Sequence, residues 1–169
     1  MGMKHRFSNS TRPQAATGSP MDAALKFLGY SARSVREVER HLDEKQYGEV
    51  EVYETVERLK ELGLLDDLAF AEAFIRTRLA TKPVSRRKLY EQLLSHELPR
   101  ELIEEALQAV DDPAEQENAL AVAEKYARQM EALPADERAR RVLQRLLTRG
   151  YAYDDAAAAV EACHLDTKE

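Results

Sequence analysis

The sequence predicts an all-α protein of three tandem three-helix repeats that stack into an elongated, curved array. Charged residues make up 33% of the chain and aromatic residues 7%, with no Trp. This composition suits helices that each bury one apolar stripe and expose a charged face. The chain is also poor in Gly and Pro, with six of each, and rich in residues that favour helix. An internal repeat, described next, indicates stacked helical units.

Each expected unit opens with a helix that carries an aromatic residue three positions after a small alanine. Residues 70–76 (FAEAFIR) align with residues 122–128 (VAEKYAR), and residues 23–29 (AALKFLG) form a weaker first copy. Positions three apart lie on one face of a helix. The alanine and the aromatic residue therefore share a face in all three copies.

The second helix of each unit repeats more closely. Residues 89–94 (LYEQLL) align with residues 142–147 (VLQRLL), and the match continues without a gap into the next helix. Val38 and Leu42 occupy the matching places in the first copy. A third helix closes each unit, and in the first unit its apolar residues recur at helical spacing: Val52, Val56, Leu59 and Leu62.

Short signals mark where these helices start and end. Residues 34–37 (SVRE) form a capping box. Asp112 is expected to cap the helix that Pro113 begins, Pro99 heads another helix, and Gly63 ends one. We expect a disordered N-terminal arm over residues 1–21, repeats over residues 22–65, 66–110 and 111–164, and a C-terminal tail over residues 165–169.

The composition excludes several classes of protein. Cys163 is the only cysteine, so an internal disulfide is impossible and a reducing, cytoplasmic compartment is expected. No stretch approaches the about 20 apolar residues of a membrane span. The histidines lack the partners of a metal site, and motifs for phosphate binding or nucleophilic catalysis are missing. We expect no metal, no cofactor and no enzymatic activity.

Basic charge gathers in two runs, although the net charge is −6. Residues 76–88 hold six basic residues and residues 138–149 hold five, with no acidic residue in either run. Residues 97–117 hold eight carboxylates and one Arg. In the second run, one helical stripe contains Arg138, Arg141, Arg145 and Arg149. This stripe is either a solvated face paired with the acidic third helices or a contact surface for a polyanion or an acidic protein groove.

The start of the second unit contains two adjacent carboxylates and an arginine on an apolar face. Asp66 and Asp67 point in different directions on a helix, so a helix N-cap is a better interpretation than a catalytic pair. Arg78 lies among the apolar residues of its helix and must either extend to solvent or form a pair. We expect a bridge from Arg78 to Asp66 or Asp67.

Residues 64–71 (LLDDLAFA), followed by residues 74–78 (FIRTR), resemble the signature of the RecX family. Residues 24–28 (ALKFL) and 85–89 (SRRKL) resemble the family's first two units, and the likeness extends over residues 22–163. Two departures are visible. Residues 96–97 (HE) stand where the family typically has Lys-Gly, and the basic excess of some members is missing.

The resemblance implies a monomeric regulator that needs no cofactor. Such proteins bind the groove of the filament that RecA recombinase forms on single-stranded DNA. They inhibit its ATPase, strand-exchange and coprotease activities in recombination and SOS repair. The residues expected to contact the RecA filament or its phosphates are Arg76, Lys82, Arg86, Arg87, Lys88, Arg138, Arg141, Arg145 and Arg149.

Two alternatives stay open. Three-helix units resemble helix-turn-helix domains, so the chain could bind nucleic acid without recombinase. Its basic helices, however, lack the Asn, Gln and Ser side chains expected for base recognition. It could also be a helical scaffold for another protein partner, in which case recombinase activity would not respond to it.

Overall fold

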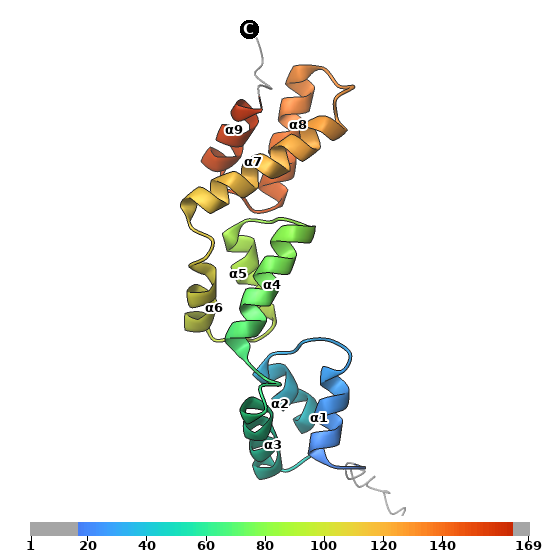
Figure 1. The fold of residues 1–169 in the computed structure, drawn as a ribbon. Helices are drawn as coiled ribbons and strands as arrows, with labels where there is room; N and C mark the ends of the chain where they lie inside the picture. Colours follow the sequence, from blue (N-terminus) through green and yellow to red (C-terminus); the bar gives the residue numbers. More distant parts are fainter. Residues whose placement is uncertain (1–16, 164–169) are drawn as a thin grey trace, which may run out of the picture.

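The computed structural model describes residues 17–163, which form nine α-helices and no strand, stacked as three groups in an elongated column (Figure 1). The all-α class and the tandem three-helix repeats are confirmed. Repeat 1 contains α1 (Pro20–Leu28), α2 (Val35–Glu44) and α3 (Glu49–Glu61). Repeat 2 contains α4 (Asp67–Thr81), α5 (Arg86–Ser95) and α6 (Arg100–Leu107). Repeat 3 contains α7 (Asp112–Gln129), α8 (Ala135–Thr148) and α9 (Tyr153–Ala162).

The predicted N-terminal arm and C-terminal tail lie mostly outside the described residues. The expected arm is covered only from Thr17 onward, and the expected tail lies wholly outside the described residues. Helix α1 begins at Pro20, two residues before the expected start of repeat 1, with Ser19 as its N-cap. The Ser19 hydroxyl accepts a hydrogen bond from the Asp22 amide at 3.0 Å.

Helix caps follow the sequence signals with one exception. The capping box of α2 is confirmed: the Ser34 hydroxyl accepts from the Glu37 amide at 3.1 Å, and the Glu37 carboxylate accepts from the Ser34 amide at 2.8 Å. Gly63 follows α3 with a φ of 69°, which glycine adopts without strain. The prediction of Asp112 as the cap of α7 is wrong. Asp111 is the cap, since its carboxylate accepts from the Ala114 amide at 3.0 Å.

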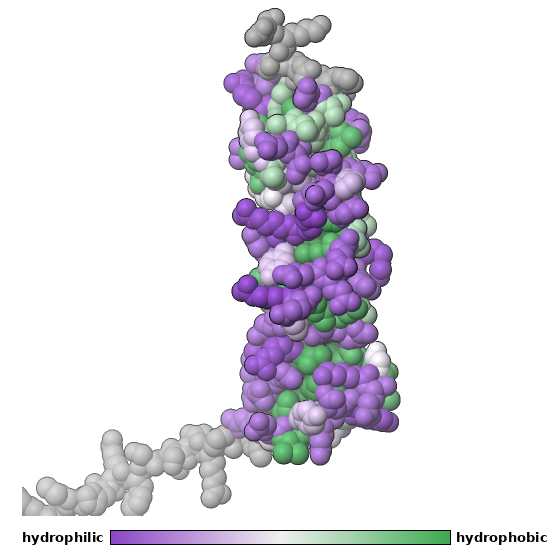
Figure 2. All heavy atoms as spheres, turned by 90° about the vertical axis from the view of Figure 1, so that its left-hand side faces the viewer, coloured by the Kyte–Doolittle hydropathy of each residue, from purple (hydrophilic) through white to green (hydrophobic). Residues whose placement is uncertain are grey.

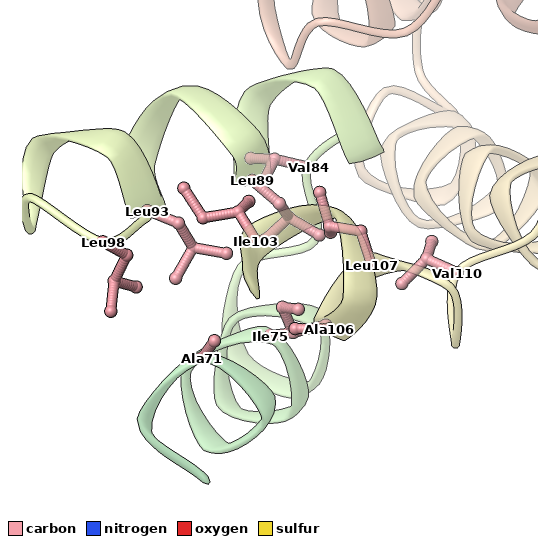
Figure 3. Close-up of a cluster of buried hydrophobic side chains, with 10 residues drawn as sticks. All are labelled: Ala71, Ile75, Val84, Leu89, Leu93, Leu98, Ile103, Ala106, Leu107 and Val110. Carbon is pink, nitrogen blue, oxygen red and sulfur yellow. The ribbon is translucent and has the colours of Figure 1, made fainter. Parts of the chain in front are cut away.

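Each repeat closes a core of its own. The aligned second-helix positions are the centres of these cores, and all six are 0% exposed: Val38, Leu42, Leu89, Leu93, Val142 and Leu146. In repeat 2, Leu89 and Leu93 of α5 face Ile103 of α6 and Ile75 of α4 (Figure 3). Truncating a buried leucine such as Leu93 to alanine typically costs about 2–5 kcal/mol. Apolar burial therefore holds each repeat together internally.

The third helices lie along one side of the column, at the left of Figure 1. Carboxylates outnumber basic side chains in α3, α6 and α9. Figure 2 shows this side as mainly hydrophilic, with apolar patches separated by polar side chains. The first basic run lies on the C-terminal half of α4, the loop that follows it and the first turn of α5, and the second lies on α8 and its C-cap.

Candidate contact surface and the repeat junctions

Repeat 1 meets repeat 2 through the N-terminus of α2, a contact that we call the first junction. The Ser34 hydroxyl donates to the His96 carbonyl at 2.6 Å, and the Val35 amide donates to Asp67 Oδ1 at 2.9 Å. Glu37, which is 7% exposed, places Oε1 3.0 Å from His96 Nδ1. The Asp67 carboxylate of repeat 2 thus accepts a hydrogen bond from the Val35 amide, which the first turn of α2 leaves unpaired within the helix.

Repeat 2 meets repeat 3 in the same manner, at the second junction. The Ser85 amide donates to the Arg149 carbonyl at 3.0 Å, and the Arg86 amide donates to both carboxylate oxygens of Glu115 at 3.0 Å. Ser34 and Ser85 occupy equivalent N-caps, as do Val35 and Arg86 at the first helical positions. The two junctions are therefore copies of one arrangement, in which a serine-capped helix start rests on the next repeat.

Arginine side chains add contacts at the second junction that the first junction lacks. Arg149 donates to the Pro83 carbonyl and to the Tyr126 hydroxyl, each at 2.6 Å. Arg86 donates to the Val110 carbonyl at 2.9 Å and to Asp112 at 2.7 Å. Both arginines therefore bind neighbouring segments of this chain.

The residue after the C-cap of the second helix in each repeat adopts a left-handed conformation, with φ values of 65° at Gln46, 59° at Glu97 and 91° at Gly150. A Cβ at Gly150 would lie 2.5 Å from Ser85 Oγ, so glycine is required there. Glu97 bears a side chain at the equivalent place, and its carboxylate pairs with Arg40 of repeat 1. Residues 96–97, which depart from the family pattern, thus both contact repeat 1.

The nine basic residues expected to bind a partner divide into two groups. The exposed ones are Arg76, Lys82, Arg87, Arg141 and Arg145, and the half-buried ones are Arg86, Lys88, Arg138 and Arg149.

The structure brings the two basic runs together at the second junction. Lys82 directly precedes Pro83, whose carbonyl Arg149 holds. A Cβ at Gly150 would lie 3.2 Å from Lys88 Cβ. Charge that is separate in the sequence is therefore concentrated where repeats 2 and 3 meet.

Apart from the pair of Arg86 with Asp112, the ion pairs of the basic runs join residues of one helix and are exposed. Arg141 pairs with Glu137 at 2.6 Å, and Arg87 pairs with Glu91 at 3.3 Å, each one turn away on the same helix. Exposed pairs of this kind stabilise a protein by less than about 1 kcal/mol. Over residues 17–163, none of the ion pairs of the arginine stripe reaches a third helix, so the predicted pairing with acidic third helices is not found there.

Tyr126 of α7 organises the end of the stripe. The guanidinium carbons of Arg145 and Arg149 lie 5.6 and 5.3 Å from the centre of its ring, close enough for cation–π attraction. The hydrogen bond from Arg149 lowers the pKa of the Tyr126 hydroxyl, and the charge of Arg145 adds to this effect. Two arginines of the stripe thus lie against one aromatic ring.

The expected bridge from Arg78 to Asp66 or Asp67 is wrong. Asp66 instead caps α4 by accepting from the Ala69 amide at 2.9 Å, which confirms the N-cap interpretation. Asp67 is used by the first junction. Nε of Arg78 is buried and lacks a hydrogen-bond partner among the described residues.

Burial affects both junction carboxylates. It raises the pKa of Asp67 and the pKa of Glu115, while the hydrogen bonds from Val35 and Arg86 act in the opposite direction. Glu115 is buried and Asp67 is half-buried, and each carboxylate accepts a backbone amide from the preceding repeat.

No group of three or more His, Cys, Asp or Glu side chains in residues 17–163 could hold a metal ion. None of the helices described is long and apolar enough to cross a membrane.

Comparison with known proteins agrees with this architecture. Three models of the RecX family match this chain in order. The model of the first three-helix domain matches residues 21–59, that of the second matches residues 66–107, and that of the third matches residues 114–160. The crystal structure of RecX from Lactobacillus salivarius superposes with a TM-score of 0.73 at 26% identity, covering 87% of this chain and 96% of that one.

Curated relatives named regulatory protein RecX give the same result. The one from Chlorobaculum tepidum is 32% identical over 136 residues, which are 80% of this chain and 82% of the relative. The one from Bacillus licheniformis is 31% identical over 138 residues, 82% of this chain but 52% of the relative. The chain thus spans about half the length of some relatives that it matches. Three consecutive domain matches and a relative matched over most of both sequences show that the chain belongs to the RecX family of regulatory proteins.

Proposed function

We propose that this protein binds the filament of RecA recombinase on single-stranded DNA and inhibits its ATPase, strand-exchange and coprotease activities. The observation that carries the proposal is the meeting of two basic runs at the second junction of an elongated body whose net charge is −6. Such a body can lie along a groove, and its basic region can face acidic protein surfaces or phosphates. Membership of a family of regulatory proteins supports this role.

The contact surface is narrower than the charge pattern alone predicts. Arg86 and Arg149 donate to carbonyls of neighbouring segments, so we assign them to holding the repeats together. The proposed contact residues are Arg76, Lys82, Arg87, Lys88, Arg138, Arg141 and Arg145. Arg87, Lys88 and Arg141 form exposed ion pairs within their own helices. Such pairs are weak, so a carboxylate or phosphate of a partner can take the place of the intrahelical carboxylate at little cost.

We also propose that the protein acts as a monomer in the cytoplasm and carries out no catalysis. The described residues supply neither a metal-binding group nor a cluster of convergent catalytic side chains. Inhibition would then come from occupation of the filament, with no chemical step on this chain.

The test is single-stranded-DNA-dependent ATP hydrolysis by RecA of the same organism, with this protein titrated below one molecule per recombinase. We expect strong inhibition by the natural chain and its loss in Arg141→Glu/Arg145→Glu. The matched control is Arg36→Glu/Arg58→Glu, which makes the same charge change on exposed helix positions of repeat 1. Unchanged inhibition by the Arg141/Arg145 variant would contradict the proposed surface.

Binding to naked DNA is the second candidate, favoured by the same meeting of basic runs. Binding driven by phosphate contacts weakens steeply with salt. Tight, salt-sensitive binding of single-stranded DNA in the absence of RecA, together with unchanged RecA ATPase activity, would favour this second function.

A further inference from the structure

Repeat 1 presents a junction face that the structure leaves without a preceding repeat. At both junctions, the receiving repeat offers the end of its second helix and a carboxylate from the first turns of its first helix. In repeat 1 the equivalent end of the second helix is residues 45–47, and the first turn of α1 carries the carboxylate of Asp22, although at a different helical position from Asp67 and Glu115. The left-handed residue Gln46 corresponds to Glu97 and Gly150.

This face contains a cavity of about 820 Å³. Its lining includes Asp22, Lys26, Phe27, His41, Lys45 and Tyr47. The rings of Phe27 and His41 stack in it with their centres 4.0 Å apart. At the first junction, the aligned Phe74 and its neighbour Phe70 lie against His96, which contacts repeat 1. In repeat 1, Phe27 and His41 border the cavity, where no residue like His96 among those described brings a neighbouring repeat against them.

The Asp22 carboxylate at this face accepts no hydrogen bond from the described residues. Asp67 and Glu115 accept amides from the preceding repeat. Among residues 17–163, Glu44 at the same face has only a 3.9 Å pair with Arg40. The face therefore offers apolar surface and two carboxylates, beside the lysines Lys26 and Lys45, to a segment with hydroxyl, aromatic and basic groups.

We propose that residues 1–16 of this chain fold back and cover this face in the place of a preceding repeat. The chain approaches from the rim of the cavity, since Thr17 and Ser19 belong to its lining. The Tyr47 hydroxyl holds this approach, at 3.2 Å from the Gly18 carbonyl and 3.3 Å from the Ser19 carbonyl. Sixteen residues reach up to about 50 Å when extended, and a short tether supplies an effective concentration on the order of millimolar.

The sequence of the segment matches the chemistry of the face. It contains Lys4, Arg6 and Arg12 and no carboxylate, which complements Asp22 and Glu44. Residues 10–12 (STR) repeat the hydroxyl-then-arginine order of Ser85 and Arg86. Phe7 is its aromatic side chain and suits a cavity floored by stacked rings.

A second copy of the chain is a poorer occupant. The far end of the array presents α8, which follows Pro134 and has no side-chain cap. The serine-capped helix start that fills both junctions is therefore missing from the end that a second copy would offer. Contact with a preformed face offsets the entropy of ordering residues 1–16.

The test compares the full-length chain with its Phe7→Ser/Arg12→Ser variant by NMR. Burial already lowers the pKa of His41, so uncovering the cavity should raise the pKa of His41 toward its ordinary value and shift the amide signals of residues 45–47. The control, Tyr153→Ser/Arg128→Ser, removes the same two side-chain types from exposed positions of repeat 3 and should leave these signals in place.

Two outcomes would overturn the proposal. Signals of residues 45–47 and of His41 that stay unchanged in the Phe7/Arg12 variant would show that the face is bare. Signals that change on dilution of the natural chain would show that a second molecule covers it. Conversely, a synthetic peptide of residues 1–16, added to a chain that starts at Thr17, should restore the original signals, whereas a scrambled peptide should not. The core residues all lie between Met21 and Cys163, so the shortened chain retains its three cores.

Discussion

The two junctions share one backbone arrangement but differ in the side chains that strengthen it. At the first junction, His96 meets the buried Glu37, and the pair of Arg40 and Glu97 is exposed. At the second, Arg86 and Arg149 donate to the carbonyls of Val110 and Pro83. Arginine stays charged at all physiological pH values and has several fixed donors. The comparison teaches that repeats 2 and 3 form the more firmly joined pair, while repeat 1 is the more separable unit.

The largest effect is expected from Gly150→Ala. The new Cβ would enter a left-handed position and approach Ser85 Oγ, which should destabilise the chain by about 2–4 kcal/mol. Urea unfolding followed by circular dichroism measures this change. If the variant is as stable as the natural chain, the close approach at the second junction does not constrain it.

The next effect compares arginines across the junctions. Arg149→Ala removes hydrogen bonds to Pro83 and Tyr126 and should cost about 2 kcal/mol, as for hydrogen bonds from charged donors. Arg40→Ala at the first junction removes an exposed pair and should cost less than about 0.5 kcal/mol. Equal losses in urea unfolding would contradict the difference drawn between the junctions.

Glu97→Gly at the first junction should stabilise the chain, whereas the preceding substitutions destabilise it. Glu97 holds a φ of 59°, and glycine adopts such values without steric cost. Loss of the exposed pair with Arg40 offsets part of the gain, so we expect stabilisation of about 0.5 kcal/mol. Thermal unfolding measures it, and a lower melting temperature would mean that the Arg40 pair outweighs the backbone strain.

The smallest effect concerns pH. Burial raises the pKa of Glu115 above its ordinary value of 4.5, so the folded chain holds this proton more tightly than the unfolded chain. Its contribution to stability is complete below pH 4.5 and declines as pH rises through the raised folded pKa. Glu115→Gln keeps an oxygen for the Arg86 amide and should flatten this decline, by less than about 0.5 kcal/mol. Unfolding curves between pH 4 and 7 would show an unchanged slope if Glu115 were not the cause.

The sequence predicted the fold well because a repeat aligns the residues that must be buried. Val38, Leu89 and Val142 occupy one alignment position, and all three are fully buried. Helix periodicity and capping residues are local signals, and they placed the starts of α2 and α6 and the end of α3 correctly. The one-residue error at α7 arose because Asp111 and Asp112 both precede Pro113, and either could cap by sequence alone.

The junctions could not be read from the sequence in the same way. Glu115 lies 29 positions from the amide that it accepts, and Arg149 reaches the Pro83 carbonyl 66 positions away. A backbone carbonyl has no identity in a sequence, so Arg86 and Arg149 looked like free surface charge. The alignment of Ser34 with Ser85 was the available signal, since two N-caps at one repeat position indicate a shared contact.

The separate cores bear on how the chain is made. Each core draws its residues from one continuous stretch of sequence, so its contacts are local and low in contact order, which favours rapid folding. During synthesis, chains fold from the N-terminal domain onward. Repeat 1 can therefore close its core as soon as α3 has left the ribosome, and each later repeat can form its junction on a neighbour that is already folded.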